Sequence, residues 1–176
     1  MRVSLDGVQL VGGHAPPREL LYTDVGISFW GGVDPLTANV CDHTHPLFGR
    51  CVGGKILAVP NGRGSCTGSQ VVLEVLLNGI APAAIVLRQP DAILALGVIV
   101  AEELFGVSIP IVSIGAAGFD AIADATHAAV SGSLVVGASS VIDVQAGLDA
   151  MRAEELSAAL SADEVRREGL PEPHTM

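Results

Sequence analysis

Basic and aromatic residues are both scarce in this sequence. Lysine and arginine together number 9 against 19 aspartates and glutamates, which gives a net charge of −10 at pH 7. Such a field repels the phosphate backbone, so we expect no nucleic acid partner. Aromatic residues make up 3% of the chain, so a surface that docks on another protein is expected to be built from aliphatic and small side chains.

Uninterrupted apolar runs are also missing, although 49% of the residues are apolar and the mean hydropathy is +0.53. Charged residues interrupt every candidate membrane span: Arg88, Asp91, Glu102 and Glu103. We therefore expect no membrane association. The N-terminal sequence MRVSLDGVQL lacks the basic-then-apolar layout of a signal peptide, which predicts a cytoplasmic protein. Because the content of apolar residues is high and no membrane span is expected, we predict an apolar surface that docks on a partner.

Cysteines are too few for a disulfide framework or a self-contained zinc site. Cys41, Cys51 and Cys66 are odd in number and show no C-x-x-C spacing. The segment 41–45 (CDHTH) carries ligand-type side chains in a turn before Pro46, but no third dispersed ligand is evident. We interpret it as a surface or hydrogen-bonding element and expect no metal on this chain.

Strand and helix signals alternate in the middle of the chain. At 176 residues the chain is most simply one domain with a real core. Continuous apolar strands fit burial on both faces, and Gly79 and Gly106 follow the two main helices, as expected just past a C-terminus. These signals predict an α/β fold with a β-rich N-terminal half, then βαβαβ units with right-handed crossovers. The predicted elements are strands Gly26–Trp30, Lys55–Val59, Ala83–Leu87 and Pro110–Ile114, and helices Ser69–Asn78, Asp91–Leu104 and, near the end, Phe119–Ala125.

The C-terminal part has a different character. Leu134–Val136 and Val141–Val144 are predicted to form a hairpin, and the residues that follow are helical and acidic. We divide the chain into a domain over residues 1–145 and an acidic helical C-terminal tail over residues 146–176. The tail is either a solvated helix or a clamp on a partner subunit.

The glycine-rich stretch 59–73 (VPNGRGSCTGSQVVL) links a predicted strand to a predicted helix. Its spacing excludes three common motifs. A P-loop is excluded because Gly64 and Gly68 are too close and no lysine follows. A nucleophile elbow needs a glycine two residues before Ser65, and a dinucleotide fingerprint needs a third glycine where Thr67 stands.

The chemistry of this loop still predicts an anion site. A helix that begins near Ser69 points its first free N–H groups and its positive dipole end at the loop. The glycines at 62, 64 and 68 allow a ligand to approach the backbone closely. An anion or a developing oxyanion would be stabilised there, and Arg63 could add a charge-assisted contact to a carboxylate.

The hydroxyl of Ser65 can act as a base or nucleophile only if its alkoxide is stabilised, and a nest of N–H groups is one way to achieve this. The alternative is that Ser65, Thr67 and Ser69 are only N-cap and turn residues. Cys66 and Trp30 are expected to serve packing. Asp91 is expected to cap the helix that it opens.

Several linked motifs resemble the aconitase X swivel domain, which is the small subunit of those enzymes. The resemblance spans roughly residues 20 to 144, and motifs in the right order are more specific than one glycine loop. The matching segments are 28–35 (SFWGGVDP), 45–49 (HPLFG), 62–69 (GRGSCTGS), 81–84 (APAA), 102–106 (EELFG) and 110–112 (PIV).

This resemblance implies a swivelling β/β/α domain that closes over a larger catalytic subunit with an iron or iron–sulfur centre. That large subunit is expected to be a separate polypeptide, and the reaction is dehydration of a small hydroxy acid. The catalytic serine falls on Ser65, which would take the proton next to a carboxylate. Substrate-binding groups are expected in the rest of the loop: Arg63, Gly64, Cys66, Thr67, Gly68 and Ser69.

The serine–cysteine form of the loop resembles cis-3-hydroxy-L-proline dehydratases, which makes a pyrroline-2-carboxylate the expected product. The alternative within the family is the small subunit of a phosphomevalonate dehydratase. An alternative of another class is a non-catalytic anion-binding regulatory module. An independent hydrolase ranks last, because no Ser–His–Asp arrangement is evident.

Overall fold

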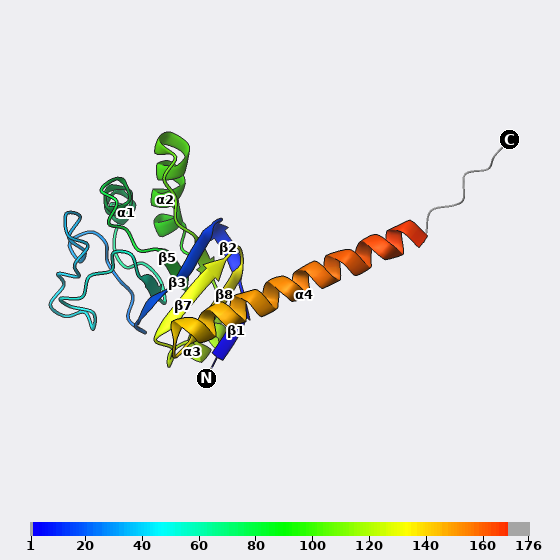
Figure 1. Cartoon of the computed structure of the whole chain (residues 1–176). Coiled ribbons are helices and arrows are strands. Elements are labelled where there is room, and N and C mark those ends of the chain that lie inside the picture. Colours follow the sequence, from blue (N-terminus) through cyan, green and yellow to red (C-terminus); the bar gives the residue numbers. More distant parts are fainter. Residues whose placement is uncertain (1, 169–176) are drawn as a thin grey trace.

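The computed structural model describes residues 2–168, with side chains through residue 154 and at residues 157 and 158. Figure 1 shows a mixed α/β domain from which one long helix projects. The elements in chain order are β1 (Arg2–Asp6), β2 (Val8–Val11), β3 (His14–Tyr22), β4 (Ile56–Val59), α1 (Gly68–Leu77), β5 (Ala84–Leu87), α2 (Ala92–Phe105), β6 (Ile111–Ser113), α3 (Gly115–Ala121), β7 (His127–Ser131), β8 (Leu134–Ala138) and α4 (Val141–Glu168).

Within the described range, 8 strands form a sheet in the order β1-β8-β7-β3-β4-β5-β6-β2. The inner strands β3, β4, β5 and β6 pair in parallel. The flanking pairs β1–β8, β7–β8, β3–β7 and β2–β6 are antiparallel. The parallel part therefore has one edge at which the carboxyl ends of its strands meet, and this edge is where α/β proteins place ligands.

Side-chain alternation along the parallel strands builds two cores. Leu57 and Val59 of β4 join the cluster beneath α1 and α2, whereas Ile56 and Ala58 point the other way. That second cluster lies between the parallel strands, the antiparallel strands and α3, and it includes Phe119. This layering follows from the two-residue period of a strand. It confirms the predicted α/β class, the βαβαβ order and the C-terminal helix.

The hairpin predicted with Val141–Val144 as its second strand is wrong. β8 pairs instead with β7, and Val141 begins α4. Ser140 starts this helix, because the backbone N–H of Asp143 donates to its Oγ at 3.2 Å. Val144 and Leu148 are then buried on the antiparallel sheet, and the later turns project away from it (Figure 1). The division of the chain after residue 145 stays a prediction.

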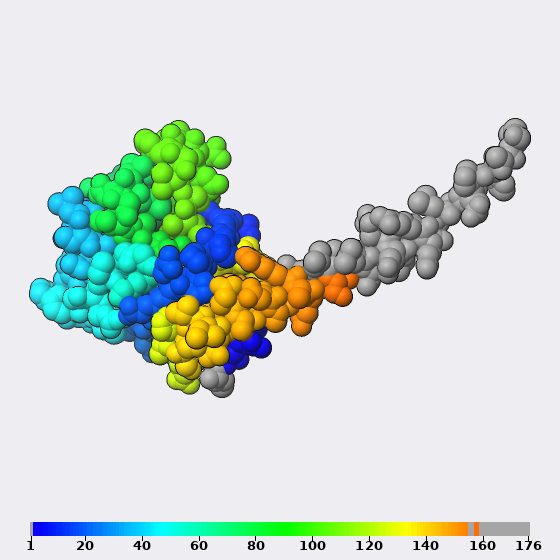
Figure 2. Space-filling view, viewed as in Figure 1, coloured from blue at the N-terminus to red at the C-terminus, as the bar shows by residue number. Residues whose placement is uncertain are grey.

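Residues 23–55 connect β3 to β4 without adding a named strand to the sheet. The strand predicted over Gly26–Trp30 is wrong, because this stretch makes a single bridge, from Ile27 to Gly62. The segment is nevertheless packed, with Phe29 and Val33 among its buried side chains. Figure 2 shows it in cyan and light blue beside α1, at the end of the domain away from α4. Among the described residues, no helix is long and apolar enough to cross a membrane.

Candidate active site

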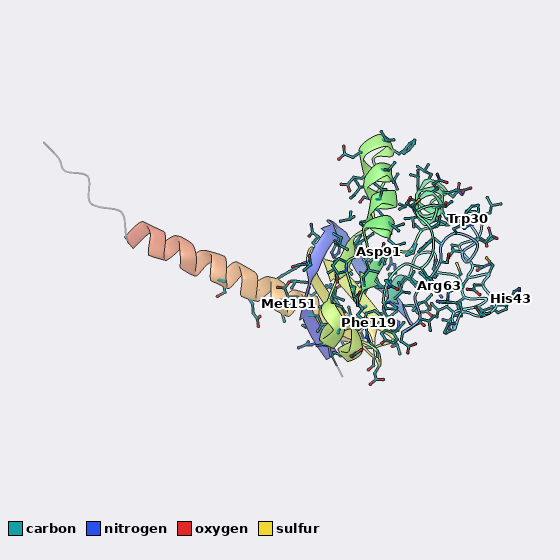
Figure 3. All side chains as sticks on the ribbon, turned by 180° about the vertical axis from the view of Figure 1, so that it is seen from behind. Trp30, His43, Arg63, Asp91, Phe119 and Met151 are labelled. Atoms are coloured by element: carbon teal, nitrogen blue, oxygen red, sulfur yellow. The ribbon has the colours of Figure 1, made fainter. Side chains whose placement is uncertain are left out.

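The glycine loop, residues 60–67, leaves the carboxyl end of β4 and enters α1. Gly64 has a φ of 108°, a conformation that glycine adopts without the steric cost of a side chain. The loop therefore turns sharply at the sheet edge before the helix begins at Gly68. Figure 3 shows Arg63 and Trp30 at the end of the domain away from Met151 of α4.

Asp91 ties this loop to the start of α2. Its Oδ1 accepts the backbone N–H groups of Ile93 at 2.9 Å and Leu94 at 3.0 Å, which confirms the predicted helix cap. Its Oδ2 accepts the N–H of Gly62 at 2.8 Å. A side chain at position 62 would place a Cβ 2.9 Å from that oxygen, so the close approach requires glycine.

The segment that carries Ile27 holds the other side of the loop. The N–H of Ile27 donates to the carbonyl of Asn61 at 3.2 Å, and the N–H of Arg63 donates back to the carbonyl of Ile27 at 2.8 Å. A Cβ at Gly26 would lie 2.6 Å from Oδ1 of Asn61. The loop is thus fixed from two sides by elements distant in sequence.

The free N–H groups lie one turn earlier than the sequence predicts. The N–H groups of Gly68, Ser69 and Gln70 donate to carbonyls of the loop at 3.0 to 3.1 Å, so the first helical amides are already satisfied. Those of Gly64, Ser65 and Cys66 have no hydrogen-bond partner in the part of the chain that the structure describes. Three successive amides without a partner leave N–H donors available to an oxyanion at this loop.

Ser65 is exposed and its hydroxyl is held in place by Thr67. The backbone N–H of Thr67 donates to Oγ of Ser65 at 3.0 Å, and the Ser65 hydroxyl donates to Oγ1 of Thr67 at 2.8 Å. A donor aimed at Oγ stabilises the alkoxide more than the neutral hydroxyl. Position 65 therefore combines solvent access, a fixed rotamer and local support for negative charge.

Arg63 is paired with Asp42, a residue that the sequence placed in no catalytic role. Nη2 of Arg63 donates to Oδ2 of Asp42 at 2.7 Å, and the two side chains are 53% and 22% exposed. Both residues line a groove of about 350 Å³ together with Gly64 and Trp30. The guanidinium of Arg63 is thus present at the loop, but it is paired with a carboxylate that the sequence analysis did not predict.

The remaining predicted residues have distinct positions. The hydroxyl of Ser69 donates to the carbonyl of Cys66 at 2.7 Å, so it serves the turn. Thr67 precedes α1 but makes no side-chain cap bond. Cys66 is a free, exposed thiol, and Gly68 is buried. Ser65 and Gly68 also line a narrow cleft with Asp91 and Ile93.

Trp30 does not pack in the core, so that expectation is wrong. Its side chain is 61% exposed, whereas Phe29 beside it is 1% exposed. Phe29 points into the core, and Trp30 lies in the turn that follows it, where the N–H of Val33 donates to the carbonyl of Phe29 at 3.3 Å. Trp30 therefore forms a wall of the groove.

The histidines of the 41–45 segment make local contacts. Nδ1 of His45 accepts the N–H of Leu47 at 3.2 Å, so its Nε2 carries the proton and donates to the carbonyl of Val25 at 3.3 Å. His43 contacts the ring of Phe48 at 4.4 Å between centroids. Among the described residues, no group of three or more His, Cys, Asp or Glu side chains could hold a metal ion.

Sequence reasoning missed two polar contacts. Asp42 was seen only as part of a ligand-rich turn, and Asp91 only as a helix cap. Both reach the glycine loop across 21 and 29 residues of sequence. No signal in the neighbouring sequence identifies such a contact. Once the position of a glycine-rich loop is known, each aspartate of the chain can be tested as its partner.

Comparison with known proteins identifies the family of this chain. The family model of the aconitase X swivel domain matches residues 4–137. The chain is 64% identical over 106 residues to cis-3-hydroxy-L-proline dehydratase of Pseudomonas aeruginosa, covering 60% of this chain and 18% of that protein. It is 49% identical over 116 residues to the enzyme of the same name from Hypocrea jecorina, covering 66% and 20%. The chain thus spans about a fifth of the length of these two relatives.

Two further similarities concern smaller proteins. The phosphomevalonate dehydratase small subunit of Methanocella arvoryzae is 40% identical over 98 residues, which cover 56% of this chain and 74% of that subunit. A crystal structure of Thermococcus kodakaraensis aconitase X in its holo form matches with a TM-score of 0.65 at 34% identity. That match covers 76% of this chain and 96% of the other.

Proposed function

The chain belongs to the aconitase X swivel domain family, and from this premise we propose that it is the swivel subunit of a hydro-lyase. Its substrate is cis-3-hydroxy-L-proline, and its product is a pyrroline-2-carboxylate. The identity of 64% to the Pseudomonas aeruginosa dehydratase supports this choice over phosphomevalonate, whose dehydratase small subunit is 40% identical. The share of that small subunit that is covered, 74%, keeps phosphomevalonate as the second candidate.

Ser65 supplies the base in this proposal. Its alkoxide removes the proton from the carbon next to the carboxylate, and the electron pair of that C–H bond forms the ring double bond as the bond from the neighbouring carbon to its hydroxyl breaks. The leaving hydroxyl takes a proton from solvent and departs as water, and Ser65 returns its proton to solvent, which regenerates the alkoxide. The N–H of Thr67, 3.0 Å from Oγ, supports the charge on the base. The unpaired amides of residues 64–66 and the guanidinium of Arg63 support the charge that develops on the substrate carboxylate. The observation that carries the proposal is the exposed hydroxyl of Ser65 beside these amides.

The iron or iron–sulfur centre of the family is assigned here to a large partner subunit. Among the described residues, no group of three or more His, Cys, Asp or Glu side chains could hold a metal ion. In this proposal the chain contributes proton transfer and substrate binding. When bound to that subunit, the centre would supply a Lewis acid for the leaving hydroxyl.

Apolar side chains around the site support docking on that subunit. Trp30 is 61% exposed at the groove, and Ile93 is 37% exposed at the cleft that Ser65 lines. Leu96 follows one turn later on α2 and is 49% exposed. Exposed apolar residues that surround a polar site are typical of a surface that a partner covers. Closing this surface would remove water from the amides of the glycine loop.

Reconstitution with the large subunit tests the proposal through Ser65→Ala. We expect this variant to lose turnover of cis-3-hydroxy-L-proline by at least about a hundredfold, because general-base catalysis contributes about 10²–10⁴ in rate. Assembly, followed by size-exclusion chromatography, should be unchanged since Ser65 is exposed. Thr67→Val, which keeps the backbone N–H, should retain more turnover than Ser65→Ala. Near-normal turnover by Ser65→Ala would remove Ser65 from the mechanism.

A further inference from the structure

The groove beside the glycine loop carries two opposite charges side by side. Asp42 comes from the 23–55 segment and Arg63 from the loop, and their side chains meet at 2.7 Å. The groove that they line has a volume of about 350 Å³, with Trp30 and Gly64 among its other walls. Such a space accommodates a single small molecule and presents it with both a cation and an anion.

Asp42 is held as a carboxylate at this position. Its Oδ1 accepts both the backbone N–H and the hydroxyl of Thr44, at 2.9 and 2.7 Å. These hydrogen bonds, led by that from the Thr44 hydroxyl and assisted by the charge of Arg63, lower the pKa of Asp42 below its ordinary value. The residue is therefore ionised at neutral pH, and its turn fixes the direction of the carboxylate.

Neither member of the pair is saturated by the other. A carboxylate has about four acceptor positions, and the described residues occupy three of those on Asp42, through Thr44 and Arg63. A guanidinium has about five N–H donors, and that of Arg63 uses one of them on Asp42. One acceptor position and most of the donors thus stay available to a ligand in the groove.

We propose that Asp42 recognises a substrate ammonium, so that the Asp42–Arg63 pair selects a molecule that carries an ammonium next to its carboxylate. The inference rests on the proposed function and names the residue that separates its two candidate substrates. A cyclic amino acid places its carboxylate on Arg63 and its ring N–H groups on Asp42. A phosphorylated hydroxy acid has no cation for Asp42 and brings like charge toward it, which is unfavourable.

Trp30 adds a second contribution to the same preference. Its indole forms an exposed wall of the groove, and an aromatic face attracts a cation within about 6 Å. The apolar ring carbons of the ligand also have a surface there to cover. The groove therefore matches a ring that is cationic at one position and apolar at the others.

A binding experiment separates recognition by Asp42 from a role in which Asp42 only positions Arg63. The assembled enzyme is titrated calorimetrically with L-proline and with cyclopentanecarboxylate, which have the same ring and carboxylate but differ in the ammonium. We expect the wild type to prefer L-proline and Asp42→Asn to lower this preference by about tenfold, because a hydrogen bond to a charged group is lost.

Asp34→Asn is the matched control. Asp34 lies in the same segment and also accepts from a backbone N–H, that of Leu36 at 2.9 Å, and from the hydroxyl of Thr37 at 2.8 Å. It does not line the groove, so this variant should keep the wild-type preference.

Four outcomes would overturn the inference. A wild-type enzyme that binds both ligands equally contradicts it without any variant. An Asp42→Asn enzyme whose affinities for both ligands fall by the same factor shows a positioning role only. Failure of the wild type to dehydrate cis-3-hydroxy-L-proline contradicts the proposed function and the inference with it. Normal turnover by the wild type, together with an unchanged ligand preference in Asp42→Asn, contradicts the role of Asp42 alone.

Discussion

Replacement of Asp91 by alanine removes three hydrogen bonds, two at the start of α2 and one that joins α2 to the glycine loop. Two of them, to the N–H groups of Ile93 and Leu94, cap the helix. The third, 2.8 Å long, satisfies the N–H of Gly62. We therefore expect Asp91→Ala to weaken the helix terminus and to release the loop that carries Ser65.

The size of the effect follows from these bonds. Loss of a helix N-cap costs about 1 kcal/mol, and an N–H left without its acceptor costs about 1–3 kcal/mol. Together they predict a loss of about 2–4 kcal/mol in the free energy of unfolding, or a fall of roughly 5–15 °C in Tm for a domain of this size. Asp91→Asn keeps a good N-cap but turns an amide N–H₂ toward Gly62, so it should lose only about 1–3 kcal/mol.

Ser140→Ala provides the control for the cap alone. Ser140 accepts the N–H of Asp143 at the start of α4, away from the loop, so we expect about 1 kcal/mol of destabilisation with turnover unchanged. Stability is measured by urea unfolding of each variant, and turnover in the enzyme reconstituted with its large subunit. Asp91→Asn should lose turnover although its cap is kept. If Asp91→Asn matches the wild type in both assays, Asp91 has no role in holding the loop.

Two further predictions concern stability alone. Gly97→Ala should lower the free energy of unfolding, measured in urea, by about 1–3 kcal/mol. The reason is that its Cβ would lie 2.5 Å from the carbonyl oxygen of Ser69, where α2 crosses α1. A gain in stability, as alanine gives in an exposed helix, would contradict this contact. The Lys55 ammonium, by a hydrogen bond, and the charge of Arg50 hold the pKa of Glu19 below its ordinary 4.5. The ion pairs of Glu19 with Lys55 and Arg50 therefore contribute fully to stability above pH 4.5, and this contribution is lost as the pH falls through the lowered pKa of Glu19. The Tm of Glu19→Gln should fall less steeply with acid than that of the wild type. Equal slopes would argue against a stabilising role of these ion pairs.

The alternating strands and helices between residues 55 and 114 could be predicted because their signals are local. Apolar runs define β4 and β5, and Gly106 ends α2 in the left-handed conformation, which a glycine favours. The glycine loop could likewise be placed between strand and helix from its sequence alone. Each of these predictions needs only neighbouring residues.

What the sequence could not provide depends on contacts across the chain. Val141–Val144 has the apolar content of a strand, but β7 already pairs with β8, and Ser140 directs the chain into a helix. The orientation of Trp30 was decided by Phe29, whose ring fills the core. The ion pair between Arg63 and Asp42 joins two loops, and the hydrophobic periodicity of the sequence does not predict that these loops lie close together.

The 23–55 segment contributes a wall of the groove but no strand of the sheet. A graft of this segment from a relative with another substrate would exchange Asp42 and Trp30 while the hydroxyl of Ser65 and its amides kept their scaffold. Substrate selectivity could then change through substitutions in the 23–55 segment. Reactivity could change independently, through the scaffold that holds Ser65. Chimeras within the family offer a direct way to redesign such enzymes.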